Sequence, residues 1–280
     1  MNTQKTLILG EKNWPKQDNV IALDFLEIDR QGLKLGTSRT LQVHDCDGNW
    51  LDIRGVLWRG QFDSDLAQEF ALLGMIEASG VPCINSARGL RLFSDRISMH
   101  ALLAHAGLPV VSSAFFLGKS GYGYYHEPDL PCVLKVGNWH MGYGKIKVDS
   151  KQQWLDAVDM AAISKDFIAV EPWIDYTADI RILVVGKEII VIERIPSQWK
   201  ANVCPIDIKF IEAPPGLVDQ SRKAAEFMQM EILGVDWVFD RKGNWIVLEA
   251  NAAPGLEFLN LDLRPLAMEM LKEKMRDYET

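Results

Sequence analysis

Residues 246–255 read Ile-Val-Leu-Glu-Ala-Asn-Ala-Ala-Pro-Gly, and this stretch decides how the rest of the chain is interpreted. Its three aliphatic residues are typical of a buried strand, which the Pro-Gly pair then ends. Residues two apart on a strand point to the same face, so Glu249 and Asn251 would present a carboxylate and an amide oxygen side by side. Oxygen ligands of this kind are those that Mg²⁺ takes when it also holds substrate phosphates.

A second stretch, residues 234–239, predicts the partner strand, with Asp236 among apolar neighbours. Residues 241–244 read Arg-Lys-Gly-Asn, which is typical of the tight turn that joins two strands into a hairpin. Pairing would place Asp236 across from Glu249, so that Asp236, Glu249 and Asn251 converge on one metal site. The alternative is that the two carboxylates are solvated edges of an ordinary hairpin.

The overall composition is that of a soluble globular enzyme. The 280 residues are 48% hydrophobic and 24% charged, and a chain of this length predicts two or three compact units. The net charge of −8 argues against a nucleic-acid partner, so phosphate binding would have to come from individually placed residues.

The cysteines and the N-terminus bear on the cellular compartment. The four cysteines are far apart and form no Cys-x-x-Cys pair, which disfavours a zinc site or a disulfide framework and fits a reducing cytoplasm. The N-terminal apolar run is too short for a signal peptide, and no run approaches the length of a membrane span. We therefore expect a cytoplasmic protein without a membrane partner.

The pattern of strands and helices predicts an α/β (α+β) fold in three parts. Residues 1–92 form a small N-terminal α/β domain. Residues 93–170 form a central subdomain that begins with a capped helix over 96–106. Residues 171–280 form a C-terminal subdomain with a helix over 218–233, the hairpin described above and a closing helix over 263–275.

Within the N-terminal domain, Arg59 follows a predicted buried strand. It either faces a substrate or begins a surface loop. Trp58, Trp139 and Trp199 could line the same pocket, although a buried Trp is more often part of a core.

The central subdomain contains a candidate phosphate-binding flap. Residues 131–136 predict a buried strand that carries Lys135, and a charge there is costly without a partner. An anionic ligand would be such a partner. The loop that follows contains Gly142 and Gly144 before a second strand at 145–148, so its backbone N–H groups could bind phosphate oxygens and its glycines would let it close.

The C-terminal subdomain begins with a strand that runs into Glu171-Pro172-Trp173-Ile174. Because proline removes a backbone donor, such a connector has partly unpaired backbone that can receive a flat base. A hairpin follows at 179–194, whose alternation places Asp179 and Arg181 on one face and Arg194 at the far end of the partner strand.

Taken in order, these residues resemble the ATP-grasp superfamily of carboxylate–amine ligases over roughly residues 93–275. Three blocks are similar to synapsins: 135–149, 171–175 and 199–202. Three others are similar to ribosomal-protein glutamate ligases and bacterial glutathione synthetases: 179–181, 193–194 and 249–256.

The resemblance implies an ATP-grasp fold, in which two α+β subdomains behind a small N-terminal domain grip ATP. It implies Mg²⁺, with Mn²⁺ as an alternative, bound by Asp236, Glu249 and Asn251. It implies nucleotide contacts from Arg96, Lys135, Gly142, Gly144, Lys145, Glu171, Trp173, Ile174, Asp179 and Arg181. Arg194, Lys200 and Asn202 would stabilise the transferring phosphoryl group.

Some positions depart from the family pattern. Arg96 and Lys200 stand where these ligases usually have Lys and Arg, respectively, which changes the shape of each contact. The His-Arg-Gly-Gly segment typical of the glutamate ligases is replaced by residues 203–207, Val-Cys-Pro-Ile-Asp.

By this resemblance the protein is an ATP-dependent ligase that joins a carboxylate to an amine through an acyl phosphate. Its partners would be ATP, a small carboxylate or peptide, and an amine acceptor, and by analogy it would form a homodimer or homotetramer. A non-catalytic, synapsin-like ATP-binding regulatory or scaffold protein is the alternative. A small-molecule kinase on the same fold is a third reading.

Overall fold

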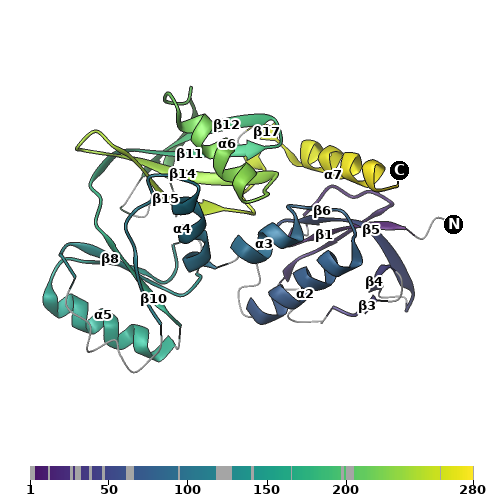
Figure 1. The fold of residues 1–280 in the computed structure, drawn as a ribbon, viewed down its shortest axis with the longest axis horizontal. Coiled ribbons are helices and arrows are strands. Elements are labelled where there is room, and N and C mark those ends of the chain that lie inside the picture. Colours follow the sequence, from purple (N-terminus) through teal and green to yellow (C-terminus); the bar gives the residue numbers. More distant parts are fainter. Residues whose placement is uncertain are drawn as a thin grey trace.

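The computed structural model describes residues 4–11, 13–25, 28, 33–37, 40–45, 48–60, 66–93, 95–117, 128–139, 142–164, 166–196, 199, 205–258 and 260–279. The molecule is elongated, with an N-terminal sheet at one end and two further sheets at the other (Figure 1). No helix in these ranges is long and apolar enough to cross a membrane.

The N-terminal sheet has the strand order β2-β1-β5-β4-β3, and β6 pairs with β5. Its strands are β1 (Lys5–Leu9), β2 (Val20–Leu23), β3 (Leu35–Thr37), β4 (Leu41–His44), β5 (Trp50–Trp58) and β6 (Cys83–Ile84). The helix α2 (Leu66–Ser79) lies between β5 and β6 in the chain, and α3 (Ala87–Phe93) follows β6. β1 runs parallel to both β2 and β5, so the carboxyl ends of β1 and β5 meet at one edge of the sheet. That edge carries Arg59 toward the rest of the molecule.

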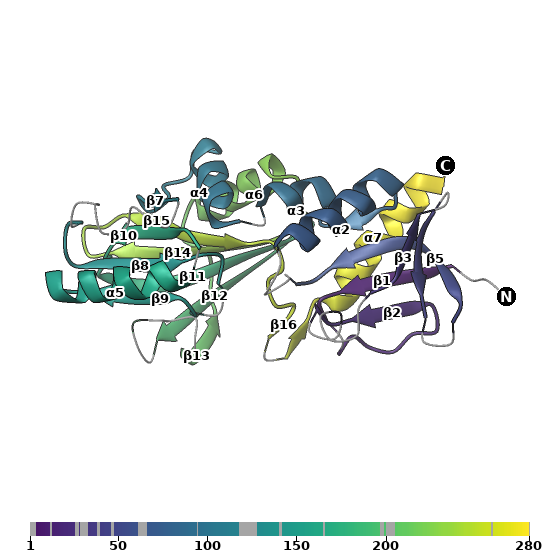
Figure 2. The ribbon, with the colours of Figure 1, turned by 90° about the horizontal axis from the view of Figure 1, so that it is seen from below.

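The C-terminal helix α7 (Arg264–Glu279) packs on this N-terminal sheet. Its Leu271 and Met275 lie in one buried cluster with Ile8 and Leu57 of the sheet. Figure 2 shows α7 against β1 and β5, far from the end that carries α5. The predicted division, in which 171–280 forms a single subdomain, stays a prediction, and the structure adds that the last helix completes the N-terminal core.

The predicted central subdomain contains an antiparallel sheet in the order β7-β10-β8-β9. Its elements are α4 (Arg96–His105), β7 (Ala114–Phe116), β8 (Cys132–Val136), β9 (Lys145–Val148), α5 (Lys151–Ser164) and β10 (Ile168–Pro172). The predicted cap is confirmed, because the carboxylate of Asp95 accepts the N–H of Ser98 at 2.9 Å. α5 buries Trp154 and Val158 against this sheet.

The C-terminal sheet is antiparallel in the order β13-β12-β11-β14-β15. Its elements are β11 (Tyr176–Val185), β12 (Glu188–Pro196), β13 (Pro205–Phe210), α6 (Leu217–Phe227), β14 (Ile232–Asp240) and β15 (Trp245–Asn251), followed by the short pair β16 (Glu257–Phe258) and β17 (Leu261–Asp262). The helix predicted over 218–233 ends at Phe227. Its last predicted turn instead enters β14, where Ile232 and Leu233 are buried as strand residues.

Candidate functional site

The hairpin predicted from the opening stretch is confirmed. Asp236 of β14 and Glu249 of β15 are Cα partners in the ladder. Both line a cleft between the central and C-terminal sheets. Asn251 pairs with Gly234 at the end of the ladder, and its side-chain oxygen accepts the N–H of Ala253 at 2.9 Å. The structure thus brings the two carboxylates together, while Asn251 in this conformation shapes the turn.

The cleft encloses about 670 Å³, part of it open to solvent. Its lining comes from both sheets and comprises Val133, Lys135, Lys145, Glu171, Pro172, Trp173, Ile174, Tyr176, Asp179, Arg194, Trp199, Asp236, Leu248 and Glu249.

An arginine network holds Asp236. Arg181 binds both oxygens of Asp236, with Nε and Nη2 distances of 2.6 and 2.7 Å. Arg194 reaches the second oxygen of Asp236 at 3.3 Å and Asp179 at 2.6 Å. The three residues Asp179, Arg194 and Asp236 are buried, so this is a desolvated chain of alternating charge.

The network sets the protonation of its members. Burial raises the pKa of Asp179 to about 6, although Arg194 opposes that shift. Burial would also raise the pKa of Asp236, but the charges of Arg181 and Arg194 outweigh it and hold that pKa below its usual value. Burial would lower the pKa of Arg194, and the carboxylates of Asp236 and Asp179 raise it instead. Asp236 therefore stays ionised as a metal ligand must, whereas the raised pKa of Asp179 is about 6.

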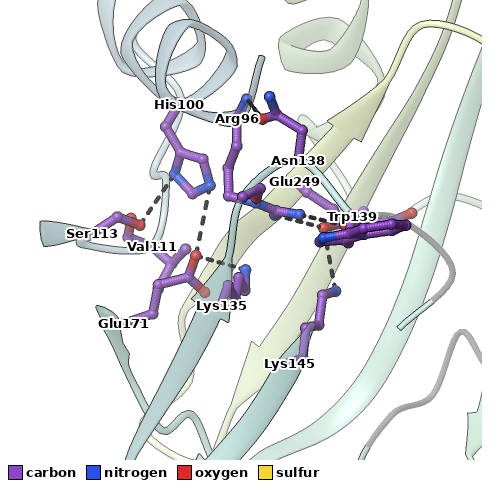
Figure 3. Close-up of polar contacts among 12 residues, drawn as sticks. Arg96, His100, Val111, Ser113, Lys135, Asn138, Trp139, Lys145, Glu171 and Glu249 are labelled. Carbon is purple, nitrogen blue, oxygen red and sulfur yellow. Dashed lines mark hydrogen bonds and ion pairs between the residues drawn. The ribbon is translucent and has the colours of Figure 1, made fainter. Parts of the chain in front are cut away.

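Glu249 is held from the other side of the cleft by two cations (Figure 3). Nη1 of Arg96 and Nζ of Lys145 each lie 3.4 Å from one oxygen of Glu249. Arg96 also donates to the carbonyls of Gly137 and Trp139, at 3.3 and 3.0 Å. One arginine thus links helix α4, the start of the loop between β8 and β9, and the carboxylate of β15.

Lys135 forms a buried pair with Glu171, at 2.6 Å between Nζ and Oε1 (Figure 3). Burial lowers the pKa of Lys135, against the raising effect of Glu171. His100 lies one helical turn beyond Arg96, with Nε2 3.7 Å from Glu171 and Nδ1 3.2 Å from the hydroxyl of Ser113. Burial lowers the pKa of His100 to about 4, so its ring is neutral at pH 7.

The predicted flap is present as the antiparallel pair β8 and β9, and it contributes Lys135 and Lys145 to the cleft. Gly142 and Gly144 have φ of +79° and +63°. A Cβ at Gly144 would lie 3.0 Å from the carbonyl oxygen of Val136, so the turn needs glycine there.

The predicted connector forms the cleft wall at Glu171, Trp173 and Ile174. The N–H of Trp173 is not open, because it donates to the carbonyl of Pro131 at 3.0 Å. Nζ of Lys147 lies 4.5 Å from the centre of the Trp173 ring, and Trp199 meets that ring edge-on at 5.9 Å. These rings make an apolar wall suited to a planar base.

Two carboxylates opposite one another, among cations from a second sheet, fit a divalent cation that is shared with phosphate groups. Within the described part of the cleft, the cations Arg96, Lys135, Lys145, Arg181 and Arg194 outnumber the carboxylates Glu171, Asp179, Asp236 and Glu249 by one. A triphosphate would reverse this balance, and a divalent metal ion would offset part of the excess negative charge.

Most of the predicted residues gather here, with differences in position. Arg96 and Arg181 border the cleft. Arg96 donates hydrogen bonds to Glu249, and Arg181 donates hydrogen bonds to Asp236. Lys200 and Asn202 lie outside the described residues. The sequence analysis missed Tyr176 and His100, although the i, i+4 spacing of His100 from Arg96 signals a shared helix face.

The family model "Synapsin, ATP binding domain" matches residues 83–253. A probable alpha-L-glutamate ligase of Pasteurella multocida is 25% identical over 227 residues, which are 75% of this chain and 69% of that protein. The glutamate–LysW ligase ArgX of Sulfolobus acidocaldarius is 24% identical over 198 residues, 64% of this chain and 67% of that protein. The matched segments cover about two thirds of these relatives.

Solved structures share the fold. D-alanyl-alanine synthetase A from Vibrio cholerae has a TM-score of 0.69 at 12% identity, covering 99% of this chain and 98% of its own. The ATP-grasp ligase PsnB, complexed with a minimal precursor, has a TM-score of 0.67 at 18% identity, covering 96% and 98%. With the family model matching more than half of the sequence, the chain belongs to the synapsin ATP-binding-domain family, within the ATP-grasp superfamily of carboxylate–amine ligases.

Proposed function

We propose that this protein activates a carboxylate of an amino-acid or peptide substrate with ATP and transfers the acyl group to an amine. A carboxylate oxygen attacks the γ-phosphorus, the bond to the β-phosphate oxygen breaks, and ADP leaves. The amine then attacks the acyl carbon, and phosphate leaves with the attacking carboxylate oxygen. The observation that carries the proposal is the convergence of Asp236, Glu249, Lys135, Lys145 and Arg194 on one cleft.

Each residue has a task that follows from its position. Lys135 and Lys145 face the cleft from the flap and would bind the phosphate chain. Asp236 and Glu249 would hold Mg²⁺, which supplies neutralisation of phosphate oxygens when it is bound. Arg194 would stabilise the charge that develops on the transferring phosphoryl group. Trp173 and Trp199 would pack on the adenine. This division of labour suits phosphoryl transfer, which depends mostly on positioning and electrostatics.

The relatives guide the choice of substrate. Their names identify ligases for glutamate and for LysW, and PsnB was solved with a precursor peptide. An amino acid or a peptide carboxylate is therefore the substrate class to test first, with glutamate among the amine acceptors. Mn²⁺ in place of Mg²⁺ and a homodimer or homotetramer remain part of the proposal.

The test is phosphate release from MgATP with a panel of amino acids, dipeptides and small carboxylates, run beside Glu249→Gln. We expect release that depends on one carboxylate, forms an amide detectable by mass, and is lost in the variant. Binding of MgATP without release across the panel would favour the regulatory alternative. A stable phosphorylated product without an amide would favour the kinase.

A further inference from the structure

We propose that Asn85, a residue of the N-terminal domain, is a positioning residue for the metal-binding carboxylates of the C-terminal sheet. This inference rests on the proposed function, because it assigns a role to the site of Asp236 and Glu249. Asn85 follows β6 and is 1% exposed. It lies 147 and 167 residues from its two bonded partners in the sequence, so its contacts are set by the tertiary fold alone.

The carboxamide of Asn85 bridges the start of β14 and the residue that follows β15, the two strands that carry the carboxylates. Its Nδ2 donates to the carbonyls of Ile232 and Ala252, both at 2.7 Å. Its Oδ1 accepts the N–H of Ile232 at 2.6 Å. Both N–H donors of the side chain and one of the two lone pairs of its oxygen are thus hydrogen-bonded, and the group is buried.

The position of this bridge explains its consequence for the site. The β14–β15 ladder ends at the pair Gly234 and Asn251; Ala252 follows Asn251 directly, and Ile232 lies two residues before Gly234. The amide of Asn85 therefore takes the place of a backbone partner at the open end of the hairpin. Ala252 follows Asn251 directly, so Asn85 acts on the strand end from which Glu249 projects.

Two further side chains hold the next two residues of the same turn. Oδ1 of Asn251 accepts the N–H of Ala253 at 2.9 Å. Nη2 of Arg59 donates to the carbonyl of Pro254 at 2.6 Å, while its Nε pairs with Glu11 at 3.2 Å. Arg59 is 6% exposed. The N-terminal domain thus fixes the turn through Asn85 and Arg59, at the points immediately after the predicted metal ligands.

Partners that orient metal ligands from behind typically change metal affinity or activity by about 10- to 100-fold when they are removed. The matched variant is Asn85→Asp, which keeps the shape of the side chain but replaces both amide donors with an oxygen that faces two carbonyls. The control is Ser221→Ala, which removes a buried hydrogen bond from Trp237, the neighbour of Asp236 on β14, at 3.1 Å. That control loosens the same sheet without touching the turn.

The experiment measures binding of AMPPNP to the full chain by calorimetry as Mg²⁺ is varied, and again in excess EDTA. We expect Asn85→Asp to raise the Mg²⁺ concentration for half-maximal binding by about 10- to 100-fold, with the EDTA affinity unchanged. Ser221→Ala should leave both the Mg²⁺ requirement and the affinity in EDTA near wild type, even if its melting temperature falls as much as that of Asn85→Asp. Arg59→Lys is the second variant if Asn85→Asp fails to fold, and it should shift the Mg²⁺ requirement in the same direction.

Two results would overturn the inference: a wild-type Mg²⁺ requirement in Asn85→Asp, or an equal shift in Ser221→Ala at matched stability. Glu249→Gln, measured alongside, keeps this failure separate from that of the proposed function. If Glu249→Gln leaves the Mg²⁺ requirement unchanged, the metal site itself is wrong. If it raises the requirement and Asn85→Asp does not, only the positioning role falls.

Discussion

Lys135 and Lys145 are Cα partners on the adjacent strands β8 and β9, and both face the cleft. Like charges directly opposite one another destabilise a sheet. Here each lysine has its own carboxylate, because Lys135 pairs with Glu171 and Lys145 with Glu249. The flap therefore concentrates positive charge, which the carboxylates of Glu171 and Glu249 neutralise. The oxygens of a polyphosphate ligand could take the place of these carboxylates.

Variants of the buried pair of Lys135 and Glu171 distinguish an effect on stability from an effect on nucleotide binding. Lys135→Met should destabilise the fold by about 3–5 kcal/mol, because it leaves a buried carboxylate without its partner. The double variant Lys135→Met/Glu171→Met should recover most of that stability, since an apolar pair of similar volume replaces the charges. Urea unfolding measures both. The double variant should still not bind ATP, and normal ATP affinity there would remove Lys135 from the nucleotide site.

Arg194 is predicted to contribute to turnover in addition to folding, where its loss leaves the buried carboxylates of Asp179 and Asp236 without a partner. A cation about 4 Å from developing charge is worth on the order of 4 kcal/mol at an effective dielectric of 20, or roughly 10³-fold in rate. Arg194→Lys keeps the charge but loses the guanidinium group that contacts both Asp179 and Asp236. We therefore expect it to lose part of this rate enhancement. Arg194→Ala should lose all of it.

The control for Arg194 is Arg241→Ala, which breaks the exposed ion pair between Arg241 and Asp175. Such surface pairs contribute about 0–1 kcal/mol, so this variant should keep its activity and stability. Steady-state phosphate release with the identified carboxylate gives the rates. A turnover in Arg194→Ala within a few-fold of wild type would contradict the role assigned to it.

Asp179 predicts a pH dependence of stability. Its folded pKa is raised to about 6, above the usual value of 3.8, so between these pH values the folded state binds more protons than the unfolded state. Its contribution to stability therefore falls as pH rises from about 4 to 6, by at most about 1.4 kcal/mol per pH unit. In Asp179→Asn this dependence should vanish. Thermal unfolding from pH 4 to 8 tests it, and parallel curves for the two proteins would refute the assignment.

A substitution at Arg96 tests the consequence of having Arg where these ligases usually have Lys. Arg96→Lys restores the residue usual in these ligases but loses the fork that joins Glu249 to the carbonyls of Gly137 and Trp139. A hydrogen bond from a charged group contributes about 1.5–3 kcal/mol, so AMPPNP affinity should fall at least about tenfold. The exposed pair of Arg91 and Glu77 supplies the control, Arg91→Lys. Equal affinity in Arg96→Lys and wild type would show that the fork does not order the flap.

The sequence predicted the parts of the site that depend on local pattern. The aliphatic run at 246–248, the partner strand at 234–239 and the turn at 241–244 were enough to predict Asp236 opposite Glu249, and the strand register confirms it. The cross-strand grip of Arg181 on Asp236 was not predictable, because the register of β11 against β14 joins residues 55 apart. The closing helix predicted over 263–275 is present as α7, but its packing partner, the N-terminal sheet, was not predictable.

The central claim is that the substrate carboxylate attacks ATP directly, and isotope transfer tests it most directly. The carboxylate substrate identified by the release panel is labelled with ¹⁸O in both oxygens and turned over with MgATP and the amine. The released phosphate is then analysed by mass. The account predicts one ¹⁸O in each phosphate, since the bridging oxygen of the acyl phosphate leaves with it. Amide formation with unlabelled phosphate would contradict the acyl-phosphate mechanism.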